Sequence, residues 1–154
     1  MMPRRLIALC LAAFGFASLP LDPVAAGEKT FSPEVGQICR SHTREAERRH
    51  RLPKLVLSAI SLAESGRWHP AKRMSYPWPW TVTSGADSNY YADKSEAIEA
   101  VNALKARGIR NIDVGCMQVN LHYHAGAFAN LSEAFDPIAN TDYAAKFLKN
   151  LFRS

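Results

Sequence analysis

The sequence contains very little cysteine and has no hydrophobic run long enough to cross a membrane. Its longest apolar stretch, residues 6–19, falls short of the roughly 20 residues that a transmembrane helix requires. Internal repeats and low-complexity linkers are also lacking, and the 154 residues allow one domain with one core. Hydrophobic residues make up 47% and charged residues 21%, which indicates a globular chain and not a disordered one.

Basic and small residues flank the apolar stretch in the order of a secretory signal peptide. Arg4 and Arg5 precede the stretch, and Val24-Ala25-Ala26 follows it. This pattern predicts a signal peptide over residues 1–26 and a mature domain over residues 27–154. An uncleaved anchor is the weaker alternative because the stretch is short.

The net charge and the residues around Cys10 indicate where the protein is located and what kind of partner it binds. Losing residues 1–26 removes two arginines and one aspartate, so the formal charge of +5 becomes +4. A positive protein favours anionic partners; for an exported chain, an acidic cell-wall polymer fits and nucleic acid is not expected. Leu9 precedes Cys10, where a lipid-modified cysteine needs a small residue. The protein is therefore predicted to be periplasmic or secreted, with no stable membrane anchor.

Two cysteines, Cys39 and Cys116, remain in the mature chain. In an oxidising compartment they predict one disulfide, and closing so long a loop contributes on the order of 4 kcal/mol in the chain-entropy model. Two buried free thiols are the alternative, because spacing alone does not fix pairing.

Helical periodicity and capping residues predict two helices in the first half of the mature chain. The first begins at Ser32-Pro33, where a capping residue precedes a proline. The second begins at Pro53 and ends at Gly66 in a left-handed conformation. This second helix is apolar nearly all round, so we expect it at the centre of the core.

Two later helices are marked in the same way. Asp93 with Glu96 forms a capping box, and Gly108 ends that helix. Asp136-Pro137 begins the final helix. The face expected to be buried on the final helix consists of Ala144, Phe147, Leu148 and Leu151.

The middle of the chain has a different pattern. Strand-like alternation runs through Tyr76, Trp78, Trp80 and Val82. Residues 84–87 resemble a turn and residues 89–91 a returning strand, so a small hairpin is predicted. Residues 113–120 predict a glycine-containing turn that enters a short helix. The fold class is therefore mainly α, with four or five helices and one β-hairpin.

Glu64 is the first candidate for catalysis. It shares a helix face with Leu57 and Ile60, which predicts apolar surroundings. Desolvation and the negative end of the helix dipole would both raise its pKa, as a proton donor near neutral pH requires. The alternative is a partly exposed glutamate near a helix end.

A second motif lies in residues 115–120, Gly-Cys-Met-Gln-Val-Asn. The amides of Gln118 and Asn120 can both donate and accept hydrogen bonds, which suits hydroxyl and acetamido groups of amino sugars. Met117 can line an irregular sugar subsite.

Together, Glu64-Ser65-Gly66 and residues 115–120 resemble the lytic transglycosylase family, whose domain is similar to goose-type lysozyme. That family pairs an E-S-G segment at a helix end with a later G-L-M-Q segment. Residues 140–148, which begin Asn-Thr-Asp-Tyr, look like the helix that closes the family's cleft. The resemblance spans about residues 35–152, includes the Tyr-Pro-Trp-Pro-Trp stretch typical of a proteobacterial branch, and implies an α+β, lysozyme-like fold.

The resemblance also implies roles for individual residues. Glu64 matches the single catalytic acid/base, and Ser65 matches a cleft-wall hydroxyl. Gln118 and Asn120 match positions that contact the sugar, and Met117 matches the family methionine. Cys116 replaces the usual leucine, which supports a branch-specific bridge to Cys39.

The implied reaction is cleavage of the β-1,4 bond between N-acetylmuramic acid and N-acetylglucosamine in peptidoglycan, leaving a 1,6-anhydromuramic acid end. Neither a metal nor an organic cofactor is implied, and a monomer is expected. A lysozyme-like hydrolase and a non-catalytic wall-binding or secretion-associated protein are the alternatives. Wall turnover and local wall opening for a secretion or flagellar apparatus are both compatible with the sequence.

Two features depart from the family pattern. The segment between the motifs is long and carries the predicted hairpin. The later Ala-Tyr-Asn-Ala-like motif, whose tyrosine normally lies near the catalytic glutamate, is absent before Ser154. We therefore expect either a C-terminally truncated domain or an incomplete side of the cleft.

Other candidate residues are weaker. His122 and His124 could bind metal, but no Cys or carboxylate completes such a site, so a surface or cleft-edge position is expected. One or both of Trp78 and Trp80 could stack on sugars or pack in the core. A second carboxylate, as most glycosidases use, could come from Asp87 or Asp113.

Overall fold

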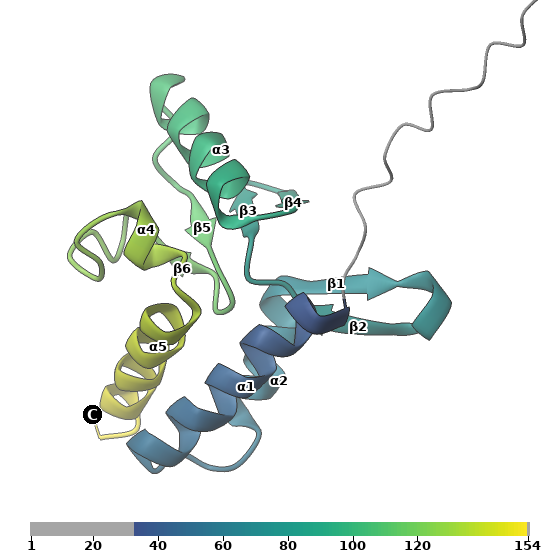
Figure 1. Ribbon diagram of the computed structural model, residues 1–154. Helices are drawn as coiled ribbons and strands as arrows, with labels where there is room; N and C mark the ends of the chain where they lie inside the picture. The colour runs from purple at the N-terminus through teal and green to yellow at the C-terminus, as the bar shows by residue number, and fades with distance from the viewer. Residues whose placement is uncertain (1–32, 154) are drawn as a thin grey trace, which may run out of the picture.

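The computed structural model describes residues 33–153, so the predicted signal peptide and its cleavage site lie outside the described residues. Within that range the chain is mainly helical with small antiparallel sheets, as the sequence predicts (Figure 1). The elements run in the order α1 (Pro33–His50), α2 (Val56–Ser65), β1 (Gly66–His69), the 3-10 helix η1 (Pro70–Lys72), β2 (Met74–Pro77), β3 (Thr81–Ser84), β4 (Asp87–Tyr90), α3 (Lys94–Ala106), β5 (Asp113–Val114), β6 (Val119–Asn120), α4 (Leu131–Ala134) and α5 (Pro137–Leu151).

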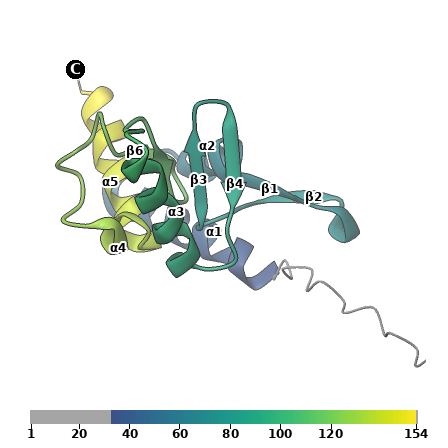
Figure 2. The same cartoon turned by 90° about the horizontal axis from the view of Figure 1, so that it is seen from above.

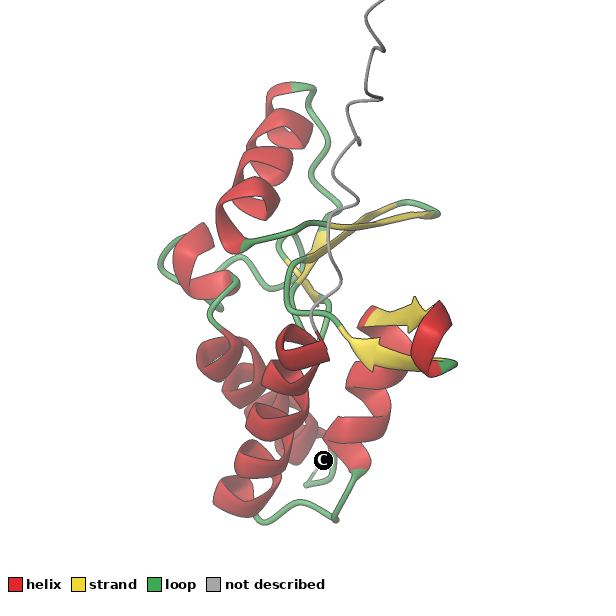
Figure 3. Ribbon diagram, turned by 45° about the vertical axis from the view of Figure 1, so that its right-hand side comes forward, coloured by secondary structure: helices red, strands yellow, loops and turns green. Residues whose placement is uncertain are grey.

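Buried side chains form two clusters, which define a helical lobe and a sheet lobe. In the helical lobe, α1 packs against both α2 and α5 (Figures 1 and 3). In the sheet lobe, α3 packs on β3 and α4. Phe128 contacts both clusters, so the lobes meet there. The largest buried side chains include Leu57 of the helical lobe and Phe135, Ile112, Val82, Val101 and Val114 of the sheet lobe.

The predicted hairpin at residues 76–91 is correct in its second half only. The turn after Ser84 joins β3 to β4, with Ser84 opposite Asp87, and the sheet order is β4-β3-β5-β6. Tyr76, however, lies in β2, which pairs with β1 in a separate hairpin. Pro77 and Pro79 explain the break, because proline has no N–H to continue a ladder.

The second helix begins later than predicted. α2 starts at Val56 and not at Pro53, because Leu55 adopts a left-handed conformation with φ 68°. The buried Glu47 carboxylate of α1 accepts hydrogen bonds from the N–H groups of Leu55 (3.0 Å) and Ser58 (2.9 Å). A side chain from another helix therefore caps α2, which local sequence cannot reveal.

The end and the burial of α2 also differ from expectation. Gly66 is extended, with φ −66° and ψ 114°, so the predicted left-handed terminator is wrong. Glycine is needed there for space, since a Cβ would lie 2.3 Å from the Leu62 carbonyl oxygen. Only one side of α2 is buried, through Leu57, Ser61 and Ser65, and Leu62 is 41% exposed.

Residues 113–120 form a tight hairpin, so the predicted short helix is wrong. β5 pairs with β6, placing Asp113 opposite Asn120 and Val114 opposite Val119. The connecting turn, residues 115–118, has positive φ at both of its ends, 81° at Gly115 and 47° at Gln118. Two left-handed residues reverse the chain here and prevent a helix.

The caps of the last two long helices are confirmed. The Asp93 carboxylate accepts from the Glu96 N–H at 2.9 Å, and the Asp136 carboxylate accepts from two N–H groups at the start of α5. The expected buried face of α5 is wrong in part, because Phe147 and Leu151 are exposed. The buried side of α5 runs instead through Asn140, Thr141 and Ala145.

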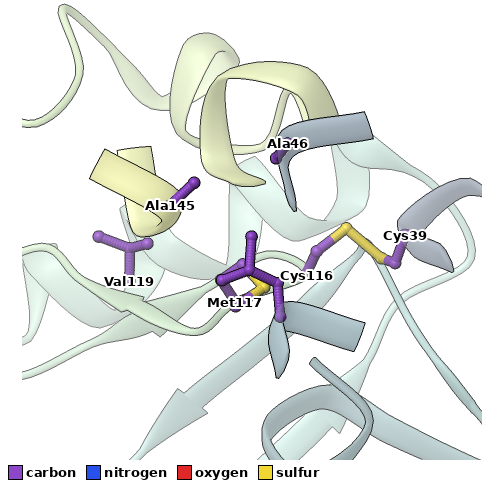
Figure 4. Close-up of a cluster of buried hydrophobic side chains, with 7 residues drawn as sticks. Cys39, Ala46, Cys116, Met117, Val119 and Ala145 are labelled. Atoms are coloured by element: carbon purple, nitrogen blue, oxygen red, sulfur yellow. A yellow bond between two sulfur atoms is a disulfide. The ribbon is translucent and has the colours of Figure 1, made fainter. Parts of the chain in front are cut away.

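A disulfide joins Cys39 to Cys116, with their Cα atoms 5.5 Å apart (Figure 4). It connects α1 to the turn between β5 and β6 across 77 residues of sequence. Both cysteines belong to the core of the helical lobe, together with Met117, Val119 and Ala145. Among the described helices, none is both long and apolar enough to span a bilayer.

Candidate active site

The turn at residues 115–118 is where distant parts of the chain meet. Both the Ser61 and the Ser65 hydroxyl lie 2.8 Å from the Cys116 carbonyl oxygen, which links α2 to the turn. From α5, the Asn140 amide oxygen accepts from the Met117 N–H at 2.9 Å. These bonds are buried, so they are strong constraints on the position of the turn.

Asn140 is the central link between the turn and α5. Its amide nitrogen donates to the Val114 carbonyl at 3.1 Å and the Ala134 carbonyl at 3.0 Å. With the bond from Met117, the whole amide is used internally while its side chain is fully buried. Gly115 makes room for it, since a Cβ there would lie 2.6 Å from the Asn140 amide nitrogen.

Glu64 lies exposed at the C-terminal end of α2. The expectation that Leu57 and Ile60 would bury it is wrong, because the buried stripe of α2 runs through Leu57, Ser61 and Ser65. Steps of four residues tilt that stripe away from Glu64. The carboxylate is therefore open to a ligand from solvent.

Ser65 does not lie on an open surface. Its side chain is 0% exposed, and its hydroxyl is 2.9 Å from the Ser61 carbonyl as well as 2.8 Å from that of Cys116. The predicted cleft-wall contact with sugar is therefore replaced by a structural one. Ser65 holds the end of α2, and with it Glu64, on the turn.

The two amides predicted to contact sugar are also bonded within the protein. The Gln118 amide oxygen accepts from the Thr83 hydroxyl at 2.5 Å, and its nitrogen donates to the carbonyls of Thr81 and Gly115. Gln118 is half-buried and connects the turn to β3. It therefore fixes the sheet lobe against the turn.

Asn120 has a similar internal network. Its amide nitrogen donates to the side chains of Asn111 at 2.6 Å and Asp113 at 2.9 Å. Its oxygen accepts from the N–H groups of His122 and Tyr123. The remaining predicted contact, Met117, is only 7% exposed and packs in the helical lobe.

An apolar hollow of about 280 Å³ lies between α2, α5 and the hairpin turn. Ile60, Met117, Gln118 and Phe147 are among the side chains that line it. Glu64 lies one turn beyond Ile60 on α2. Phe147, predicted to be buried, is exposed because it lines this hollow, whereas Glu64 is not among the residues that line it.

His124 and Tyr143 form a pair at this hollow that the sequence did not single out as one. The Tyr143 hydroxyl and His124 Nδ1 are 2.9 Å apart, and the His124 ring lies edge-on to Phe147 at 5.0 Å. Both residues line the hollow. Among residues 33–153 no cluster of potential ligands could hold a metal ion. His122 is exposed and His124 is half-buried at this hollow, so neither histidine lies in the core.

The remaining candidates divide between core and surface. Trp78 is buried, and its indole N–H donates to the Tyr91 carbonyl at 2.7 Å, so it is a core residue. Trp80 packs on the sheet lobe. Asp87 is exposed in the β3–β4 hairpin, and the Asp113 carboxylate accepts a hydrogen bond from Asn120. A role as the second catalytic carboxylate stays a prediction for both residues.

A charged cluster joins α1 to α5 in the helical lobe. Asp142 accepts from Arg49 at 2.9 Å, from His50 at 2.7 Å and from Lys146 at 2.9 Å. Partial burial raises the pKa of Asp142, but the hydrogen bonds from His50, Lys146 and Arg49 outweigh it and hold the pKa well below its usual range. The cluster is therefore an electrostatic contact between two helices.

The chain was compared with protein-family models, with curated proteins and with solved structures, and it matches none of them.

Proposed function

We propose that the protein is a lytic transglycosylase with a lysozyme-like fold, in which Glu64 is the single acid/base. Its substrate is the β-1,4 bond between N-acetylmuramic acid and N-acetylglucosamine in peptidoglycan. One observation carries the proposal: the three segments that resemble the family, which begin at Glu64, Gly115 and Asn140, meet at one turn. Ser65 and Cys116 are 51 residues apart in sequence, and Met117 and Asn140 are 23 apart.

The position of Glu64 supports this role. α2 ends at Ser65, and β1 begins at the next residue. Ser65 holds that helix end on the turn, and Gln118 holds the same turn on β3. An exposed carboxylate on so well-fixed a helix end can meet an extended polymer without a rearrangement of the backbone.

The proposed reaction consumes no water molecule. Glu64 donates a proton to the glycosidic oxygen as the bond from that oxygen to C1 of N-acetylmuramic acid breaks. The resulting carboxylate takes the proton from the C6 hydroxyl of the same sugar, whose oxygen then bonds to C1. The products are a 1,6-anhydro end and a free C4 hydroxyl on N-acetylglucosamine, and Glu64 regains its proton.

Substitution of Glu64 tests the assignment. Glu64→Gln keeps the shape but removes the acid, so release of soluble fragments from purified sacculi should fall on the order of 100-fold or more. Glu99→Gln is the matched control, because Glu99 is also exposed but lies on α3 in the sheet lobe. Wild-type release by Glu64→Gln would contradict the proposal.

A non-catalytic wall-binding protein with the same fold is the second candidate. It is favoured by the internal hydrogen bonds of Ser65, Gln118 and Asn120, which leave these side chains committed to the fold. Sedimentation with sacculi and no released fragment from the wild-type chain would support this candidate over the enzyme.

A further inference from the structure

The β1–β2 hairpin, residues 66–77, projects from the body of the protein and is called the arm below. Figures 1 and 2 both show it extending away from the helices, with η1 at its far end. Figure 2 shows that its direction differs from that of the β3–β4 hairpin. Because β1 begins directly after Ser65, the arm is a continuation of the helix end that carries Glu64.

The base of the arm is fixed to its surroundings. The backbone N–H of Trp78 donates to the Ser65 carbonyl at 2.8 Å, and the Tyr90 hydroxyl donates to the Gly66 carbonyl at 2.9 Å. Tyr76 is buried against α1, where Gly36 leaves room for it, since a Cβ on Gly36 would lie 2.6 Å from the Tyr76 Cβ. The arm therefore keeps a defined position relative to Glu64.

The arm is cationic. The chain contains no acidic residue between Gly66 and Ala86, whereas the arm itself carries two arginines, one lysine and one histidine. Lys72 and Arg73 are exposed at the far end, and neither takes part in an ion pair within residues 33–153. Such a surface complements an anionic partner.

An aromatic side chain accompanies these cations. Trp68 is 57% exposed and pairs in register with Ser75. Neighbouring residues of a strand point to opposite faces, so Trp68 and Ser75 lie on the face opposite to Tyr76, away from α1. An exposed indole on a rigid strand offers a flat apolar surface on which a sugar ring can stack.

We propose that the arm binds the glycan strand of peptidoglycan beside the bond that is cut. Trp68 stacks on a sugar ring, and Lys72 with Arg73 binds carboxylates of the polymer. Trp68 lies roughly 7 Å along β1 from Gly66, so it meets a sugar next to Glu64 and not the reacting one. This inference rests on the proposed function, because the ligand is the same polymer.

Binding to sacculi tests the proposal without interference from cleavage. In the Glu64→Gln background, we expect Lys72→Glu with Arg73→Glu to weaken co-sedimentation with purified sacculi about tenfold, more so at low salt. Trp68→Ala should weaken it by about fivefold, and Trp68→Phe should restore most of the loss because it keeps a stacking ring. These side chains are exposed, so circular dichroism should show an unchanged fold.

Lys105→Glu with Arg107→Glu is the matched control, since it makes the same charge change on exposed residues at the end of α3 and should bind like the parent. Equal losses in both double variants, or no loss in the arm variants, would overturn the proposal. So would loss of binding to phosphatidylglycerol vesicles with unchanged binding to sacculi, which would assign the arm to a membrane surface.

The two proposals can fail separately. Arm-dependent binding to sacculi by a wild-type chain that releases no fragments would refute the enzyme and keep the arm. Fragment release that depends on Glu64, together with binding to sacculi that is unchanged in the arm variants, would support the enzyme and refute the role of the arm.

Discussion

Gly115 shows how much of the site depends on a single small residue. It allows the left-handed turn after β5, and it leaves space for the fully buried Asn140 amide. From the sequence, Gly115, Gln118 and Asn120 were predicted to form a motif on a turn. The sequence could not predict that the side chains of Gln118 and Asn120 bond within the protein, or that Gly115 leaves space for another side chain. Their partners, such as Thr83 for Gln118, come from distant segments of the chain.

Gly115→Ala should therefore destabilise the protein by about 3 kcal/mol, because it combines a left-handed alanine with a clash against a buried amide. Gly108→Ala is the control: its φ is 80°, close to the 81° of Gly115, but a Cβ added at Gly108 would have nothing within 4 Å. It should cost only about 1 kcal/mol. Urea unfolding measures both, and equal losses would show that Asn140 does not matter.

At the scale of elements, the two aspartate caps were predicted correctly, whereas the left-handed end at Gly66 and the short helix in residues 113–120 were not. Asp93 and Asp136 begin their helices as predicted, since a cap acts on neighbouring N–H groups. The start of α2 could not be predicted, because Glu47 on another helix caps it. Pro77 and Pro79 indicate a break before β3, but the alternation of aromatic residues around them led to the prediction of one continuous strand.

The stabilisation that Asp142 provides between α1 and α5 should depend on pH. Its folded pKa is depressed, so the stabilisation is complete above the unfolded value of about 3.9 and is lost as pH falls toward the folded value. Asp142→Asn should lower the free energy of unfolding by about 1–2 kcal/mol at pH 7. The difference from wild type should shrink below about pH 4.

Urea unfolding between pH 7 and pH 2 measures this effect. Asp87→Asn, at an exposed position in the β3–β4 hairpin, serves as the control and should follow the wild type throughout. A wild-type minus Asp142→Asn difference that stays constant or grows in acid would contradict the assigned role.

At the scale of the whole molecule, the disulfide and the hydrogen bonds to Cys116 bring α1, α2 and the hairpin turn together. Cysteine count and predicted export favoured a bridge but left two free thiols as the alternative. The mainly helical class with a small sheet also followed from periodicity. The division into two lobes did not, since it depends on which apolar faces pack together.

Removing the bridge should lower stability without abolishing the helices. Cys39→Ala with Cys116→Ala should lose about 4 kcal/mol in the free energy of unfolding, because the bridge spans 77 residues of sequence. Reductant should destabilise the wild type toward the same value and leave the double variant unchanged. Equal stability of the two proteins without reductant would show that the bridge does not stabilise the fold.

The proposed reaction is tested most sharply by the mass of the sugar ends released from purified sacculi. We expect the wild-type chain to leave 1,6-anhydromuramic acid ends, which are lighter by one water than hydrolytic ends, and Glu64→Gln to leave almost none. Hydrolytic ends alone, or anhydro ends formed by Glu64→Gln at the wild-type rate, would contradict the assignment of Glu64 as the acid/base of a lytic transglycosylase.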